Sequence, residues 1–133
     1  MTDFLDANPI VRYVVIDNAD QARAAAELIE SDTELTVTPT VLLEAGFTLR
    51  SVYRLSREDV VDALLAVIRR DNVAVHGLDK TIAETALEMC RPSGRVSLGD
   101  AMLWAAAVSE APARVHTFDT HFPSEGVEVR EPK

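Results

Sequence analysis

Short runs of β-prone residues alternate along the chain with longer segments whose apolar residues recur at helical spacing. The runs lie at residues 4–5, 35–37, 73–75, 115–118 and 127–129. Helices are predicted from Pro9, over 20–30, from Pro39 to about 53, from Ser56 to about 70, over 78–90 and over 101–108. Alternation of this kind is typical of an α/β fold with a mostly parallel sheet.

Several local signals support these helices. Pro9 and Pro39 suit a first helical turn, where a missing N–H costs little. Ser56 and Asp59 have the spacing of a helix-start signal, and the helices on either side of residues 53–56 should form a hairpin between the second and third strands. Residues 101–108 are all apolar, which predicts a helix that is buried on most sides.

Length and composition limit the protein to a simple organisation. A chain of 133 residues with 47% hydrophobic content suits one domain, 1–133, with a real core. There is no apolar run of the roughly 18 residues that span a membrane and no leader-like start, so we expect no membrane association and a cytoplasmic protein. The single cysteine, Cys90, fits a reducing compartment and a small buried role.

The formal net charge of -9 argues at first against nucleic acid as a partner. Two considerations weaken that objection: bound divalent cations would invert the charge of an acidic site, and a few arginines could still form a local patch. The arginines considered are those at 12, 50, 54, 57, 69 and 70. An acidic surface also suits a basic protein partner.

Four acidic residues stand where apolar runs begin or end: Asp6, Glu44, Asp100 and Asp119. Asp6 and Asp119 each follow a predicted strand, and in a parallel sheet both would lie at the carboxyl edge, where such folds place their ligand sites. Carboxylates gathered there would repel one another unless a cation lay among them. Mg²⁺ or Mn²⁺, which take oxygen ligands, would fit.

Each acid also has a purely structural interpretation. Asp6 could be a turn residue that bonds its own backbone, and Asp119 could simply begin a loop. Glu44 could lie on the solvated flank of its helix, although the apolar residues around it favour partial burial and a ligand. Asp100 follows Ser97 at capping-box spacing, where an acid also suits the helix dipole.

Taken in order, these segments resemble the motifs of PIN-domain ribonucleases, most closely the VapC toxin branch of toxin–antitoxin systems. The segments are 5–8 (LDAN), 41–44 (VLLE), 98–101 (LGDA) and 117–122 (TFDTHF). The resemblance implies a three-layer α/β/α sandwich with a mostly parallel central sheet of four or five strands. It also implies Asp6, Asp100 and Asp119 as metal ligands, assisted by Glu44.

Three further residues belong to the implied site. Asn8 lies two residues after Asp6, and Thr117 corresponds to a hydroxyl residue of the family. His121 stands where many relatives have another acid, and an imidazole there could shuttle a proton. The chain also departs from the family pattern at Pro9 and Gly99, and together these changes leave the number of metal ions open.

The implied function is hydrolysis of RNA phosphodiester bonds by water that carboxylate-bound Mg²⁺ or Mn²⁺ activates. The substrate would be RNA in single-stranded regions or loops, of transfer or ribosomal RNA. The implied partners are a cognate antitoxin, which would direct a basic side chain into the acidic pocket, and a second copy, which would dock through helices that include residues 53–68.

Other functions compete with this one. An aspartyl-nucleophile phosphohydrolase would want an acid at position 8, where the chain has Asn8. A catalytically inactive PIN-like module would use the acidic face only to bind a basic partner. A metal-free ribonuclease would use His116 and His121 as an acid–base pair and would survive chelation.

Overall fold

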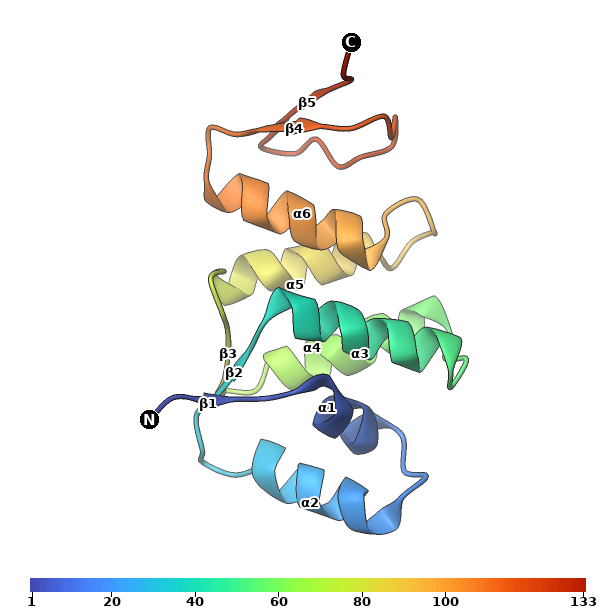
Figure 1. Ribbon diagram of the computed structural model, residues 1–133, viewed down its shortest axis with the longest axis vertical. Coiled ribbons are helices and arrows are strands. Elements are labelled where there is room, and N and C mark those ends of the chain that lie inside the picture. Colours follow the sequence, from blue (N-terminus) through green and yellow to red (C-terminus); the bar gives the residue numbers. More distant parts are fainter.

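The computed structural model describes all residues, 1–133, and contains six helices and five short strands. Figure 1 shows them along an elongated molecule. In chain order they are β1 (Asp3–Phe4), α1 (Ala7–Val14), α2 (Ala19–Ile29), β2 (Leu35–Val37), α3 (Pro39–Ser51), α4 (Arg57–Ile68), β3 (Val73–Val75), α5 (Lys80–Met89), α6 (Leu98–Ser109), β4 (Arg114–His116) and β5 (Glu128–Arg130).

The strands form two separate parallel sheets. The first has the order β1-β2-β3, in which Phe4 lies opposite Thr36 and Thr36 lies opposite Ala74. The second contains only β4 and β5, with Val115 opposite Val129. The α/β class with a parallel sheet is therefore confirmed, but the central sheet has three strands where four or five were predicted.

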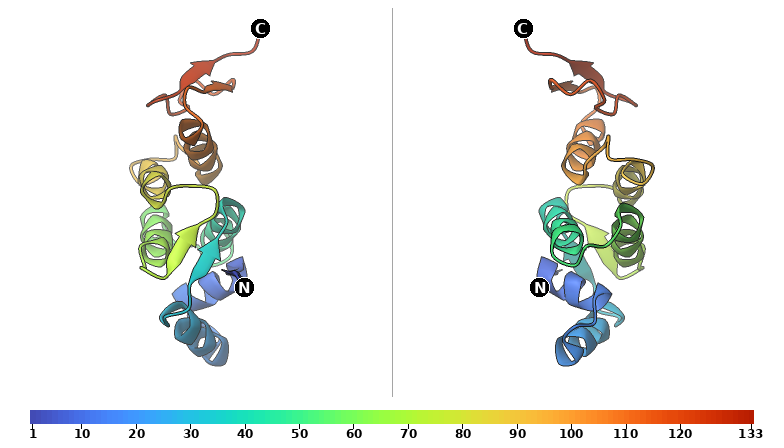
Figure 2. Two further views of the ribbon diagram at one scale, coloured as in Figure 1. Left: turned by 90° about the vertical axis from the view of Figure 1, so that its left-hand side faces the viewer. Right: turned by 90° about the vertical axis from the view of Figure 1, so that its right-hand side faces the viewer.

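The two sheets lie at different levels of the molecule. Figure 2 shows β2 and β3 between α3 on one side and α4 on the other, which is the layered arrangement that the sequence predicts. Beyond them, α5 and α6 stack toward one end, and β4 and β5 lie past α6 at that end (Figure 1). Helices α1 and α2 pack together at the opposite end.

The core is one continuous apolar cluster that runs through the helices and reaches both sheets. Leu5, Val37 and Val73 contribute from the first sheet, while Leu42 of α3 and Leu64 of α4 cover its two sides. Burial of such side chains stabilises the fold by about 1.5–3 kcal/mol each. Arg12 Nε is the one buried side-chain nitrogen or oxygen without a partner.

Local sequence signals account for the helix starts. The Ser56 hydroxyl accepts a hydrogen bond from Asp59 N–H at 3.1 Å, and Thr38 accepts one from Val41 N–H at 3.1 Å before Pro39 opens α3. Helix α1 begins two residues earlier than predicted, because Asp6 caps it at Ala7 and Pro9 falls inside the first turn. There Pro9 removes no intrahelical donor.

Helix α6 departs from the prediction of burial on most sides. Ala101, Met102, Trp104 and Ala105 are buried, but the side chain of Leu103 is 49% exposed. Composition predicts an all-apolar helix to be surrounded, whereas here α6 lies at the edge of the helical layers with one face open. None of the helices combines the length and the apolar character that a membrane crossing requires.

Candidate functional site

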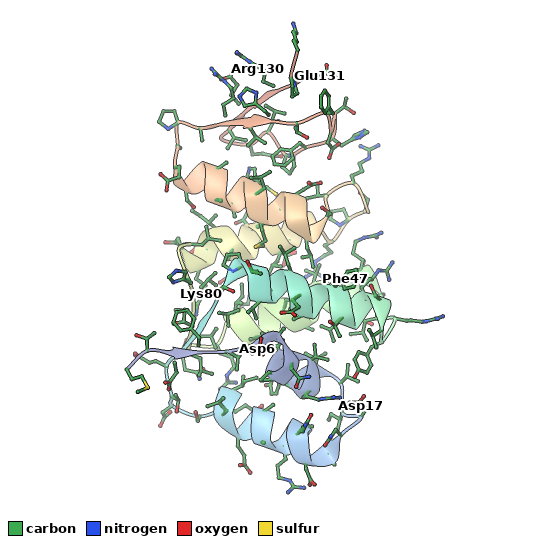
Figure 3. The ribbon with its side chains drawn as sticks, in the orientation of Figure 1. Asp6, Asp17, Phe47, Lys80, Arg130 and Glu131 are labelled. Carbon is green, nitrogen blue, oxygen red and sulfur yellow. The ribbon has the colours of Figure 1, made fainter.

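Asp6 lies at the carboxyl end of β1, where the chain turns into α1. Its Oδ1 accepts a hydrogen bond from Ala7 N–H at 2.8 Å and so caps the helix. The side chain is exposed, and Figure 3 shows it beside α1 at mid-height of the molecule. The capping interaction occupies one carboxylate oxygen and leaves the other for a ligand.

Asn8 and Glu44 lie close to this position. Helices α1 and α3 pack against each other, and both residues line one hollow of about 280 Å³ whose wall includes Ala7 and Arg12. Glu44 is exposed, so the predicted partial burial of its carboxylate is wrong. Its place on α3 turns it to the surface between two helices, where water solvates it.

Asp100 occupies the first turn of α6. Its N–H donates to the Ser97 hydroxyl at 3.1 Å, which confirms the predicted cap. The residue is half-buried, and its carboxylate lies near the thiol of Cys90. Burial, followed by the charge of Asp100, raises the pKa of that thiol to about 11. Asp100 therefore places its carboxylate at the N-terminal end of α6, close to Cys90.

Asp119 organises the turn after β4. Its N–H donates to the Thr117 hydroxyl at 3.0 Å, and its Oδ1 accepts from His121 N–H at 2.8 Å. The Nδ1 of His121 lies 4.0 Å from the same oxygen. Thr117, Asp119 and His121, which the sequence grouped together, thus form one cluster at the carboxyl end of β4.

The acids do not meet in one place. No group of three or more His, Cys, Asp or Glu side chains is close enough to hold a metal ion. Asp6 lies beside α1, whereas β5, the partner of β4, carries Arg130 at the far end of the molecule (Figure 3). The oxygen ligands suit Mg²⁺ or Mn²⁺, but this arrangement of Asp6, Asp100 and Asp119 does not fit a shared ion.

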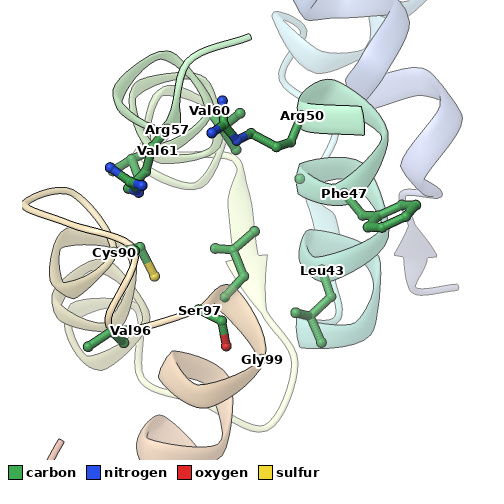
Figure 4. Close-up of a pocket in the computed structure, with 13 residues that line it drawn as sticks. Leu43, Phe47, Arg50, Arg57, Val60, Val61, Cys90, Val96, Ser97 and Gly99 are labelled. Atoms are coloured by element: carbon green, nitrogen blue, oxygen red, sulfur yellow. The ribbon is translucent and has the colours of Figure 1, made fainter. Parts of the chain in front are cut away.

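A larger cavity of about 380 Å³ opens between α3, α4, α5 and the start of α6 (Figure 4). Its walls are mainly apolar, and the side chains of Arg50 and Arg57 reach it from α3 and α4. Ser97 and Gly99 border it on the side of Asp100. A Cβ at Gly46 would overlap the Leu98 side chain, so this glycine lets α6 approach α3 closely.

The protein-family model with the description PIN domain matches residues 4–125. This range covers nearly the whole chain and contains all four acids. The chain belongs to the PIN domain family. PIN domains are generally nucleases and typically use divalent metal ions, so membership indicates a nuclease-type function for this PIN domain. A comparison with curated proteins found none that matches it.

Sequence reasoning missed some features of this PIN domain and misjudged others. It did not single out Arg50 and Arg57 as residues of one cavity, because they meet only through the packing of α3 on α4. Three of the other arginines have partners elsewhere: Arg12 pairs with Asp17, Arg69 with Glu84, and Arg70 Nε donates to a backbone carbonyl. These partners lie five or more residues away along the chain, so the i, i+3 and i, i+4 spacing of helix surfaces could not have predicted the pairs.

Proposed function

We propose that this PIN domain is an Mg²⁺- or Mn²⁺-dependent endoribonuclease that acts as the toxin of a toxin–antitoxin pair. The observation that carries the proposal is the family match over residues 4–125, with carboxylates at Asp6, Glu44, Asp100 and Asp119 inside it. When bound, the cation would supply an activated water and offset charge on the phosphodiester.

The chain's own residues have distinct tasks in this proposal. Asp6, Asp100 and Asp119 are the ligands that the resemblance implies, although the single copy keeps them too far apart to share an ion. Glu44 and Asn8 would orient water from the hollow between α1 and α3. His121 lies beside Asp119, with its Nδ1 4.0 Å from Asp119 Oδ1, and would face the same phosphodiester. The guanidinium groups of Arg50 and Arg57 offer positive charge to RNA phosphates next to the start of α6.

The proposal is tested by RNA cleavage with purified, partner-free protein in Mg²⁺, in Mn²⁺ and in EDTA. Asp100→Asn should lower cleavage roughly 100-fold or more, the size of effect expected for a group that acts on the chemistry. Asp59→Asn is the matched control, because Asp59 follows Ser56 in α4 as Asp100 follows Ser97 in α6. It should cleave like the wild type.

Each contrary result points elsewhere. Cleavage that persists in EDTA would favour the histidine pair, and hydrolysis of simple phosphate monoesters would favour the phosphohydrolase. Loss of cleavage in both variants would assign the effect to the helix starts and not to a site. No cleavage of total cellular RNA by folded, metal-loaded protein would favour a binding module.

The antitoxin part of the proposal rests on charge and shape. The net charge of -9 favours a basic partner, and Phe47, 70% exposed on α3 beside the cavity, offers an apolar anchor. Co-expression with the product of an adjoining basic reading frame should give a stable complex that suppresses cleavage. Phe47→Ser should weaken this complex, while Ile16→Ser, a change at another exposed apolar residue that borders neither the cavity nor the hollow, should not.

A further inference from the structure

Strand β1 has an unpaired edge. The Leu5 N–H donates to Thr36 O at 2.9 Å, so Leu5 directs its backbone groups toward β2. Because successive residues of a strand direct their N–H and C=O groups to opposite sides, those of Phe4 face away from β2. No strand lies on that side of β1. An open edge of this kind is a template for another strand.

Strand β4 has an unpaired edge as well. Thr117 N–H donates to Arg130 O, and Glu128 N–H donates to Ala113 O, both at 3.0 Å. These bonds turn the odd-numbered residues of β4 toward β5. The backbone groups of Arg114 and His116 therefore face the open side. A sheet of only two such short strands is marginal without further support.

The strands β4 and β5, with the turn between them, form one unit, residues 114–130, that is attached to α6. The indole N–H of Trp104 donates to Glu125 O at 2.8 Å, and Val115 and Phe122 are buried within the same apolar cluster as Trp104. Only residues 110–113 join α6 to β4. In Figure 1, α5 and α6 lie between this unit and β1, so the unit does not reach the β1 edge of its own chain.

Exposed apolar side chains accompany both open edges. Phe4 on β1 is 57% exposed, Phe118 just after β4 is 72% exposed, and Leu103 on the open face of α6 is 49% exposed. Phe4 accompanies the open edge of β1, and Phe118 accompanies the open edge of β4, so pairing of the two edges would bring these apolar groups to one interface. Each copy of the chain thus carries both halves of a contact, an acceptor edge on β1 and a donor unit beyond α6.

We propose that two copies of this chain exchange their 114–130 units, so that β4 of each copy pairs in parallel with β1 of the other. The contact is self-complementary and closes after two copies, as a two-fold dimer requires. It extends each three-stranded sheet to five strands in the order β3-β2-β1-β4-β5. It also covers Phe4 and Phe118, which the single copy leaves in water.

The exchange completes the acidic site with a residue of the second copy. Asp6 lies two residues beyond the end of β1, and Asp119 lies three residues beyond the end of β4. Parallel pairing of these strands puts both acids at the same edge of the extended sheet. Pairing through β5 would place Asp119 one strand farther away. This step rests on the proposed nuclease function, whereas the exchange itself does not.

The first test is the molar mass in solution, measured by light scattering during size-exclusion chromatography. The wild type should have twice the chain mass of 14.5 kDa. Phe4→Pro removes the N–H that faces the open edge and should give monomers, while Phe4→Ala keeps that N–H and should remain dimeric. A monomeric wild type, or a Phe4→Pro protein that is folded and dimeric, would overturn the proposal.

A second test does not depend on either variant of Phe4. In a Cys90→Ala background, a tagged copy with Asp3→Cys is co-expressed with an untagged copy carrying His116→Cys, and a short bis-maleimide is added. Both positions are exposed, and the tag gives the mixed product its own mass. The mixed product should form readily, whereas replacing Asp3→Cys by Glu27→Cys on α2 should abolish it. Equal yields from both pairs would refute the exchange.

A third test concerns the shared site. Asp6→Asn and Asp119→Asn copies are each expected to be inactive. Mixed dimers would contain one site with both acids intact, so random mixing should restore about a quarter of the wild-type cleavage. Failure of restoration, with an active wild type and proven mixed dimers, would show that Asp119 acts within its own chain. An inactive wild type would instead refute the nuclease proposal and leave the mass and cross-linking results standing.

Discussion

The surroundings of Cys90 determine the charge state of its thiol. It is 3% exposed, and its Sγ donates to Ala86 O at 3.6 Å, the geometry of a packed thiol at the end of α5. Because burial and the nearby Asp100 carboxylate raise its pKa to about 11, the thiol is neutral at physiological pH. A neutral, buried thiol is a poor nucleophile, so Cys90 is structural.

This raised pKa predicts a specific pH dependence of stability. The folded state favours the protonated thiol, so its contribution is fully present below the ordinary pKa of 9.0 and is lost as pH rises through about 11. Urea unfolding at several pH values should show a steeper loss of unfolding free energy between these limits for the wild type than for Cys90→Ala. Tyr13 and Tyr53, whose pKa values are also raised, remain in both proteins. If the unfolding free energy of the wild type and of Cys90→Ala fell equally with pH, the raised pKa of Cys90 would be contradicted.

At the scale of elements, Ser97 fixes where α6 begins and hence where Asp100 lies. Its hydroxyl accepts the Asp100 N–H, a bond that satisfies one of the free donors at the helix start. Ser97→Ala should lower the free energy of unfolding by about 1 kcal/mol, measured by urea denaturation. Ser93→Ala, in the preceding loop, should change it by less than about 0.5 kcal/mol. Equal losses of unfolding free energy from both changes would mean that the substitutions act through the loop and not through the helix cap.

The elements that the sequence predicted well are those with local causes. Residues 35–37 and 73–75 form strands within the predicted limits, because β-branched runs stand between strong helix signals. The caps at Ser56 and Ser97, and the turn at Asp119, depend on atoms only two or three residues apart. The local geometry of three of the four acids, Asp6, Asp100 and Asp119, was predictable for the same reason.

The features that could not be predicted depend on contacts between distant segments. Nothing near residues 114–130 in sequence determines that β4 and β5 pair apart from β1, since strand pairing is set by long-range packing. In the segment 53–68, through which a second copy was predicted to dock, Val60, Leu64 and Ile68 turn into the core, and sequence alone did not separate these buried residues from exposed ones. The exposure of Leu103 likewise depends on where α6 lies and not on its composition.

At the scale of the whole molecule, folding and association should be coupled. Within its own chain the 114–130 unit forms a sheet of only two strands, whereas the exchange would join it to the three-stranded sheet of the second copy. Mass action then predicts a Tm that rises with protein concentration. Calorimetry of the wild type over a hundredfold concentration range should show this rise, and Phe4→Pro should lack it. A wild-type Tm that is independent of concentration would indicate that each copy is stable alone.

The position of the exchanged unit after the other strands and helices also affects biosynthesis. Strands β1, β2 and β3 and their covering helices leave the ribosome before β4 and β5 are made, and earlier segments fold first during translation. Ribosomes that follow one another on the same messenger RNA would therefore hold growing copies whose β1 edge is already formed. Strands β4 and β5 of one copy would emerge among these neighbours, so the two copies of a dimer would tend to be translated from the same messenger RNA molecule.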